Sequence, residues 1–199
     1  MINNALLVVD VQNDFCPGGA LGVSGGTEII PVINTYVEMF SSRHWPVIAT
    51  RDWHPDKTKH FKQYGGIWPV HCVRETSGAD FHPSLHLPLN TILVYKGMDP
   101  EKDSYSAFHA EDKNGVSLEK ILRSFKTSQV WIAGLATDYC VKFSALDARD
   151  LGFHVKILID AVRGVNLQPW DSEHAVQEIV KKGAEIIRLE NANELFEQP

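Results

Sequence analysis

The sequence predicts a three-layer α/β/α domain built around a mostly parallel six-stranded sheet. Short apolar runs alternate with amphipathic segments along most of the chain, and parallel strands need helical crossovers of this kind. The apolar runs have the composition of strands that are covered on both faces. The length of 199 residues fits a single domain, residues 1–199, whose core needs no disulfide for stability.

The expected elements follow one another in a regular order. The strands are residues 5–11, 46–50, 91–96, 129–136, 154–160 and 185–190, and the helices are residues 28–42, 117–125, 138–152 and 171–183. Pro31 fits a helix only in its first turn, and Gly152 and Gly183 are typical of helix C-termini. Asp171 or Ser172 supplies a side chain suited to an N-cap.

Composition and charge argue against several classes of function. The formal net charge is −6, with no basic stripe that would bind nucleic acid. The N-terminal apolar run meets Asp10 after five residues, which is too short for a signal peptide or a membrane span. Cys16, Cys72 and Cys140 are odd in number and widely spaced, as expected of free thiols in a reducing compartment. We therefore expect a cytoplasmic protein that binds neither nucleic acid nor membrane.

Polar residues stand at the ends of the first four expected strands. Asp10 lies near the end of the first strand, Asp52 follows the second, Lys96 ends the third, and residues 136–140 form the turn after the fourth. Ligands of parallel α/β sheets bind outside the carboxyl ends of the strands. These positions therefore indicate a functional site at one edge of the sheet.

A second signal lies in residues 53–90, which form an unusually long insertion without clear periodicity. Its aromatic content argues against a disordered linker. Asp52, His54, His60 and His71 offer a carboxylate and three imidazoles, a mixture that suits zinc, iron or manganese. The residue types alone leave metal ligation and ordinary loop polarity as equal alternatives.

A third signal is the motif GLATDYC at residues 134–140. A cysteine in the first turn of a helix lies near the positive end of the helix dipole, which favours the thiolate of a nucleophile. Asp10 could accept the thiol proton if burial raises its pKa above about 3.9, and Lys96 could stabilise both anions. Taken singly, each residue is better explained by an ordinary role: a buried structural cysteine, an aspartate turn cap and a lysine reaching solvent.

Competing motifs fail on spacing. The glycine-rich loop at residues 17–26 contains no GxGxxG for a dinucleotide, and the chain has no GxxxxGK[ST], HExxH or GxSxG motif.

The motifs together resemble a known family. DVQNDFCPGGAL, DWHPDKTKHF, WPVHC, GADFHPSL, YKG, DSYSAF and GLATDYCV occur in an order and at distances similar to those of the nicotinamidases, within the isochorismatase-like cysteine hydrolase superfamily. The resemblance covers nearly the whole chain. More distant members of the superfamily lack the metal loop, and true isochorismatases also lack the cysteine. The resemblance implies a Rossmann-like sheet with the metal-binding insertion at about residues 53–90.

By this resemblance, Asp10, Lys96 and Cys140 form a catalytic triad in which Cys140 is the nucleophile. Asp10 would act alternately as base and acid, and Lys96 would hold the charged groups together. The resemblance also implies a cis peptide bond between Ala136 and Thr137. The backbone N–H groups of Ala136 or Thr137 and of Cys140 would form the oxyanion hole.

The resemblance likewise assigns Asp52, His54, His60 and His71 as ligands of one divalent metal ion, zinc by preference and iron or manganese as alternatives. Family members differ at the ligand that matches His60, and Cys72 is a less favoured soft ligand.

The substrate pocket implied by the resemblance is lined by Phe15, Leu21, Trp68, Tyr105 and Ala136. For the aromatic residues, ordinary core packing is the alternative.

The implied activity is hydrolysis of nicotinamide to nicotinate and ammonia, which would feed NAD salvage, with pyrazinamide as a second substrate. An amidase for another small amide or a carbamoyl compound, and a non-catalytic ligand-binding protein, are the alternatives. The sequence leaves the number of subunits in a homo-oligomer open.

Overall fold

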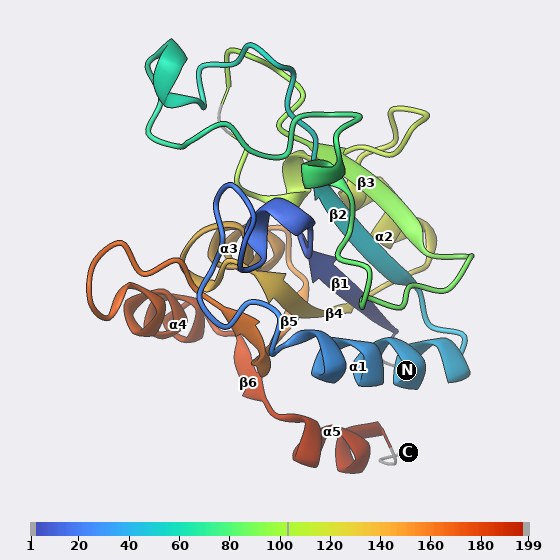
Figure 1. The fold of residues 1–199 in the computed structure, drawn as a ribbon. Helices are drawn as coiled ribbons and strands as arrows, with labels where there is room; N and C mark the ends of the chain where they lie inside the picture. The colour runs from blue at the N-terminus through green and yellow to red at the C-terminus, as the bar shows by residue number, and fades with distance from the viewer. Residues whose placement is uncertain (1–2, 103, 197–199) are drawn as a thin grey trace.

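Six strands form the central sheet (Figure 1). In the computed structural model, which describes residues 3–102 and 104–196, the strand order is β3-β2-β1-β4-β5-β6. The strands are β1 (Asn4–Val9), β2 (Val47–Asp52), β3 (Ile92–Lys96), β4 (Gln129–Leu135), β5 (His154–Arg163) and β6 (Glu185–Ile187). Every neighbouring pair is parallel. The predicted α/β class is therefore confirmed, and the sheet is parallel throughout.

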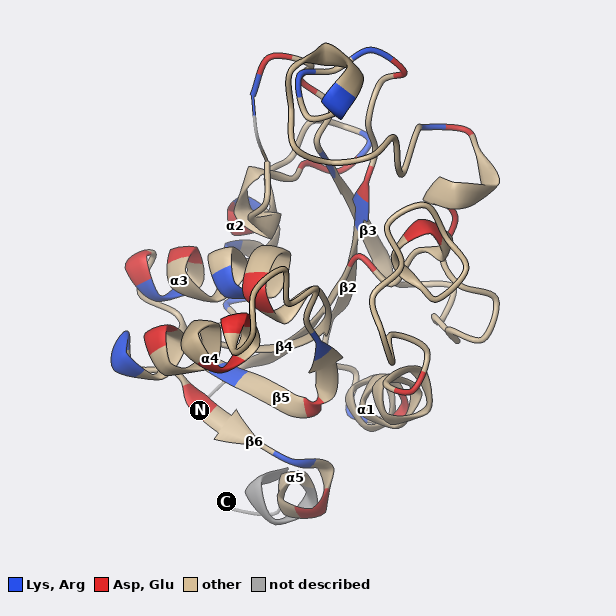
Figure 2. Ribbon diagram, turned by 60° about the vertical axis from the view of Figure 1, so that its left-hand side comes forward, with Lys and Arg blue, Asp and Glu red and all other residues tan. Residues whose placement is uncertain are grey.

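Helices cover both faces of this sheet. They are α1 (Ile30–Ser42), α2 (Leu118–Ser124), α3 (Lys142–Asp150), α4 (Asp171–Lys181) and α5 (Leu189–Phe196). Figure 2 shows α1 and α5 on one side of the sheet and α2, α3 and α4 on the other. This arrangement gives the three layers expected from the sequence.

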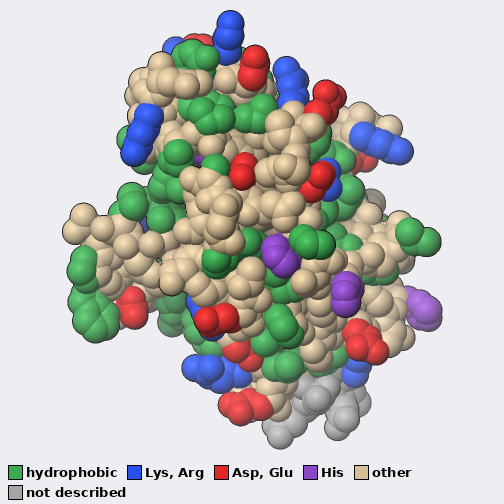
Figure 3. Space-filling model, in the orientation of Figure 1, with side chains coloured by type: hydrophobic (Ala, Val, Ile, Leu, Met, Phe, Trp, Pro, Cys, Tyr) green, Lys and Arg blue, Asp and Glu red, His purple; other side chains and the backbone are tan. Residues whose placement is uncertain are grey.

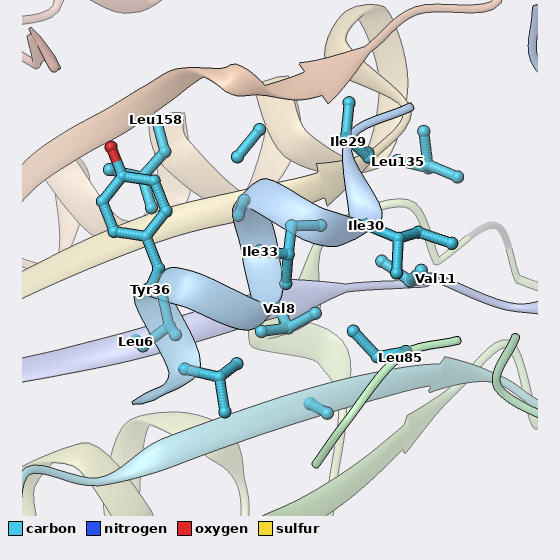
Figure 4. Close-up of a cluster of buried hydrophobic side chains, with 14 of the residues drawn as sticks. Leu6, Val8, Val11, Ile29, Ile30, Ile33, Tyr36, Leu85, Leu135 and Leu158 are labelled. Atoms are coloured by element: carbon cyan, nitrogen blue, oxygen red, sulfur yellow. The ribbon is translucent and has the colours of Figure 1, made fainter. Parts of the chain in front are cut away.

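The apolar core follows from the alternation of side chains along each strand. Leu6 and Val8 of β1 face the α1 layer, whereas Ala5, Leu7 and Val9 face the opposite layer. Figure 4 shows Ile33 of α1 beside Val8, and Tyr36 between Leu6 and Leu158. Because both faces of β1 are buried, the strand is apolar along its whole length after Asn4.

Most elements differ from their predicted bounds by one to three residues, and three differences have a clear structural origin or change the type of element. β1 ends at Val9 because Asp10 adopts a φ of 47° and leaves the extended conformation. The expected helix over 138–152 is divided into a π-helical turn, Thr137–Val141, and α3. The expected strand 185–190 ends at Ile187, and the unpredicted α5 begins at Leu189, whose N–H donates to Asp160 Oδ2 at 2.8 Å.

The strand order reverses at β1, whose neighbours β2 and β4 lead to opposite halves of the sheet. The carboxyl ends of β1 and β4 therefore open a crevice of the kind in which parallel sheets bind ligands. The first part of residues 53–90 extends beyond the carboxyl ends of β2 and β3, and the rest returns to the start of β3 (Figure 1). This insertion contains two short 3₁₀ turns, Lys62–Tyr64 and Ser77–Ala79, and is tied together by bridges such as His54 with Val73.

The surface carries charges of both signs. Figure 3 shows basic and acidic side chains interspersed with apolar ones on one face of the molecule. Among the described residues, no helix has both the length and the apolar composition needed to cross a lipid bilayer.

Candidate active site and metal site

The three residues expected to form a catalytic triad lie together at the carboxyl edge of the sheet. Lys96 Nζ lies 2.9 Å from Asp10 Oδ2 and 3.5 Å from Cys140 Sγ. Asp10 is 0% exposed, Lys96 1% and Cys140 7%. These groups are therefore shielded from bulk solvent, which strengthens their electrostatic interactions. The end of β1, the end of β3 and the turn after β4 each supply one residue of this cluster.

Asp10 is held in place by the neighbouring strand. Its positive φ of 47° is uncommon for a residue with a side chain. The N–H of Asp10 donates to Thr50 Oγ1 at 3.0 Å, and the Thr50 hydroxyl in turn donates to Asp10 Oδ1. Thr50 is 0% exposed, so this reciprocal pair fixes both the backbone and the carboxylate of Asp10. Sequence reasoning overlooked Thr50.

The electrostatics of the cluster favour a neutral thiol and a proton-accepting Asp10. Burial raises the pKa of Asp10, Lys96 opposes the rise, and the charge of Asp52 adds to it. Burial also raises the pKa of the Cys140 thiol well above its usual range, although Lys96 works against it. For Lys96, burial works to lower the pKa, but Asp10 and Asp52 outweigh burial and hold it well above its usual range. Burial thus outweighs the effect of the helix N-terminus, from which a thiolate was predicted. The Cys140 thiol therefore needs a nearby base to remove its proton.

Cys140 lies in the π-helical turn that joins β4 to α3. The carbonyl of Ala136 accepts hydrogen bonds from the N–H groups of Tyr139 and Val141, both at 3.1 Å. The cis peptide bond of this turn lies between Leu135 and Ala136. The expected position between Ala136 and Thr137 is therefore wrong by one residue.

A cluster of metal-ligating side chains adjoins the triad. Asp52, His54 and His71 are buried, and one ligand atom from each lies within 4.8 Å of the other two. Asp52 Oδ2 lies 3.2 Å from His54 Nε2 and 3.7 Å from His71 Nε2. Asp52 Oδ1 accepts a hydrogen bond from Lys96 Nζ at 2.7 Å. Lys96 thus contacts both the triad and the metal-ligating cluster.

The histidine tautomers fit a metal at this cluster. His54 Nδ1 lies 3.0 Å from the carbonyl oxygen of Gly97, and His71 Nδ1 lies 2.8 Å from that of Pro69. A carbonyl oxygen can only accept a hydrogen bond, so Nδ1 of each ring donates, and Nε2, which faces Asp52 Oδ2, is the nitrogen that could ligate a metal. For Asp52, burial works to raise the pKa, but Lys96 and His54 hold it well below its usual range, so its carboxylate is ionised. The donor set therefore suits a divalent cation.

His60 lies beside this cluster without being part of it. Its ring centroid is 4.6 Å from that of His54, and its side chain is buried. His60 Nδ1 is hydrogen-bonded to Thr58 Oγ1, which donates to the carbonyl of Pro100 at 3.2 Å. The group of three ligating residues is thus Asp52, His54 and His71. Cys72 is also buried, and its thiol is not in the group.

One cavity joins Cys140 to the cluster of potential metal ligands. Its lining includes Cys140, Asp52, His54, His60 and His71. All the residues expected to contact substrate also line it, namely Phe15, Leu21, Trp68, Tyr105 and Ala136.

Sequence reasoning missed Ser104, Tyr139 and Val165, which line the same cavity. Trp68 Nε1 donates to Tyr105 Oη at 3.0 Å, and the Trp68 and Tyr139 rings meet edge to face with centroids 4.9 Å apart. An aromatic wall built from three distant segments therefore closes one side of the cavity.

Asp138, another residue that sequence reasoning missed, holds Val165 in its place beside the cavity. The Asp138 carboxylate accepts hydrogen bonds from the N–H groups of Val165 at 2.9 Å and Asn166 at 2.7 Å. Asp138 lies in the motif around Cys140, so the motif was a signal that this position is constrained.

Fold and site together define a class of protein. The isochorismatase domain model matches residues 4–191, and the chain belongs to this family. The chain is 42% identical to the nicotinamidase of Escherichia coli strain K12, over 93% of this chain and 94% of that protein. It is 43% identical to the pyrazinamidase of Pyrococcus horikoshii, solved in complex with zinc, with a TM-score of 0.87 over 94% of this chain and 99% of that chain. PnC1 from L. infantum, solved in complex with nicotinate, is 36% identical, with a TM-score of 0.83 over 94% of this chain and 92% of that chain.

Proposed function

We propose that the protein is a nicotinamidase, a hydrolase that converts nicotinamide and water to nicotinate and ammonia. The observation that carries this proposal is the single cavity lined by both Cys140 and the ligating residues Asp52, His54 and His71. A small aromatic amide can place its carboxamide at the thiol while its ring nitrogen faces the cluster. The relatives that are named nicotinamidases support this assignment.

The chemistry follows from the groups around Cys140. Asp10, whose pKa is raised by burial, accepts the thiol proton, and Sγ attacks the amide carbon. Asp10 then gives the proton to the departing nitrogen, which leaves as ammonia while the acyl group remains on sulfur as a thioester. A water molecule gives one proton to Asp10 and attacks the thioester, and the acyl group leaves as nicotinic acid, which loses its proton to solvent to become nicotinate. The proton on Asp10 returns to the sulfur, so the enzyme is regenerated.

Two sets of groups stabilise the anions formed in these steps. Lys96 Nζ, which contacts Asp10 and Cys140, stabilises the thiolate and the carboxylate in turn. The backbone N–H groups of Ala136, Thr137 and Cys140 form the oxyanion hole of the tetrahedral intermediate in this proposal. Such donors are often the largest single contribution to catalysis.

Asp52, His54 and His71 are the residues that would hold a divalent metal, zinc by preference and iron or manganese as alternatives, and His60 is proposed as a further ligand. When bound, such a metal supplies a Lewis acid for the pyridine nitrogen of the substrate. Phe15, Trp68 and Tyr105 would pack against the ring, with Leu21 and Ala136 completing the wall.

The wider context is also part of the proposal. We treat residues 1–199 as one domain with an insertion at 53–90, supported by the single sheet to which the strands of the described chain belong. Free Cys16, Cys72 and Cys140 support a cytoplasmic location, where the activity would feed NAD salvage.

Substrate and metal dependence test the proposal together. The zinc-loaded protein should release ammonia from nicotinamide and pyrazinamide but at least about tenfold more slowly from benzamide, which keeps the carboxamide and lacks the ring nitrogen. Exhaustive chelation should remove the nicotinamide activity, and added zinc should restore it. Ammonia release and metal content are measured on the same samples. Equal rates on benzamide and nicotinamide would reject the role of the ring nitrogen at the metal, and activity on a carbamoyl compound alone would reject nicotinamide as the substrate.

The two hydrogen bonds between Thr50 and Asp10 lead to a second prediction. Thr50→Val keeps the shape of the side chain but removes the hydroxyl that holds Asp10 Oδ1. A hydrogen bond to a charged group contributes about 1.5–3 kcal/mol, so kcat should fall by about ten- to a hundredfold with little change in KM. Thr50→Ser, which keeps the hydroxyl, should recover most of the rate. Equal kcat values for the valine and serine variants would show that Thr50 does not position the base.

A further inference from the structure

The segment that follows β1 carries two polar side chains that the mechanism does not use. Asp10 is followed at alternate positions by Gln12 and Asp14. Neither of them lines the cavity that contains Cys140. Both make hydrogen bonds to backbone groups far away in the sequence, and those groups belong to or adjoin the metal-ligating residues.

Gln12 holds the backbone of Asp52 from both sides. Its Oε1 accepts from the N–H of Asp52 at 2.8 Å, and its Nε2 donates to the carbonyl of Asp52 at 2.9 Å. The β1–β2 ladder ends at Val8 and Ala49, so this side chain takes the place of a backbone partner beyond the end of the ladder. With the N–H and C=O of Asp52 both held, the direction of its side chain toward His54 and His71 is fixed.

Gln12 uses its acceptor oxygen and both of its donor hydrogens in this way. One donor binds the carbonyl of Asp52, and the other binds the carbonyl of Ala79 at 2.9 Å. Gln12 is 0% exposed, so no water can replace these bonds. The same side chain thereby joins β2 to the 53–90 insertion, which carries the histidine ligands.

Asp14 holds the other end of the cluster through Cys72. Asp14 Oδ2 accepts from the N–H of Cys72 at 2.7 Å, next to His71. The carbonyl of Cys72 accepts from the N–H of His54 at 3.0 Å, so one residue links the two histidine ligands. Cys72 has a φ of 46°, a conformation that costs a residue with a side chain free energy and needs support from its surroundings.

We infer that Gln12 and Asp14 are positioning residues that preorganise the metal site. Gln12 fixes the backbone of Asp52. Asp14 fixes the strained backbone of Cys72, the residue that links His71 to His54. The inference rests on the proposed function, because it requires that Asp52, His54 and His71 bind a metal. It also gives Gln12 and Asp14 separate roles, since each reaches a different part of one site.

The test compares zinc affinity with stability in matched pairs of variants. Gln12→Met is paired with Gln129→Met, because Gln129 is also buried and hydrogen-bonded, with Nε2 2.7 Å from Asn4 Oδ1. Asp14→Asn is paired with Asp112→Asn, because Asp112 also accepts from two backbone N–H groups, those of Asn114 and Val116. Zinc affinity is measured by competition with a chromogenic chelator, and unfolding temperature is measured on the metal-free proteins.

The two site variants should bind zinc roughly ten- to a hundredfold more weakly than the wild type, a range typical of groups that support metal ligands. The controls should stay within about twofold of the wild type, even where the unfolding temperature falls. Asp14 lies at a partly exposed position, so its variant should fold even if Gln12→Met does not. Site variants that bind zinc as tightly as their controls would overturn the inference while leaving the proposed function intact. A wild-type protein that binds no zinc would overturn both.

Discussion

Replacing Cys140 with alanine should lower the rate of ammonia release from nicotinamide by about a thousandfold or more, while the protein keeps its zinc. Loss of a nucleophile removes the covalent route altogether, which is why effects of this size are typical. The metal should remain because Asp52, His54 and His71 form the ligating group, whereas Cys140 contacts Lys96. Ammonia release and zinc content measured on the same preparation check both halves of the prediction.

Cys16→Ala is the matched control for this experiment. Cys16 is likewise a free, buried cysteine, 2% exposed, but it does not line the cavity. Its replacement should leave both ammonia release and zinc content close to those of the wild type. Undiminished turnover in Cys140→Ala would remove the thiol from the mechanism. Loss of zinc in that variant would instead place the thiol among the metal ligands.

The sheet could be predicted from the sequence because strands buried on both faces carry a continuous apolar run. ALLVV and QVWIAGL are runs of this kind, and both became central strands. The ends of elements were less predictable, since tertiary contacts decide them. The positive φ of Asp10 ended β1 early, and the bond from Leu189 to Asp160 belongs to the start of α5. Neither the φ of Asp10 nor this hydrogen bond leaves a periodic pattern in the sequence.

The candidate reacting and ligating residues could be selected from the sequence because their side-chain chemistry is distinctive. A thiol, a lysine and a cluster of imidazoles stand out in a sequence, and the fold brought Cys140, Lys96, His54 and His71 to one edge of the sheet. His60 lies beside this group of three, and its role as a further ligand stays a prediction.

The supporting residues were not predictable in the same way. Thr50 and Gln12 act through hydrogen bonds across 40 positions of sequence, and their residue types are common in ordinary loops and strands. Only the three-dimensional register between β1 and β2 gives these polar side chains a specific role.

The pairing of β1 with β4 explains why the carboxyl end of β4 needs a glycine. Gly134 is paired with Val9 of β1 and has a φ of 116°. A Cβ at this position would lie 2.0 Å from the carbonyl oxygen of Val9, far inside van der Waals contact. Because that oxygen is backbone between two buried strands, it cannot move aside as a flexible side chain could.

Gly134→Ala should therefore lower the free energy of unfolding by roughly 3 kcal/mol or more, from overpacking and from the unfavourable φ together. Gly152→Ala isolates the contribution of the unfavourable φ, because Gly152 has a φ of 84° and a Cβ added there would meet no other atom within 4 Å. That control should lose only about 1 kcal/mol. Urea unfolding of both variants checks the difference. Equal losses would show that the two strands can separate at Gly134.

Any Gly134→Ala protein that folds should also lose turnover. Val9 precedes Asp10, and the strand of Gly134 leads to Cys140. Separating the two strands therefore moves the base away from the nucleophile.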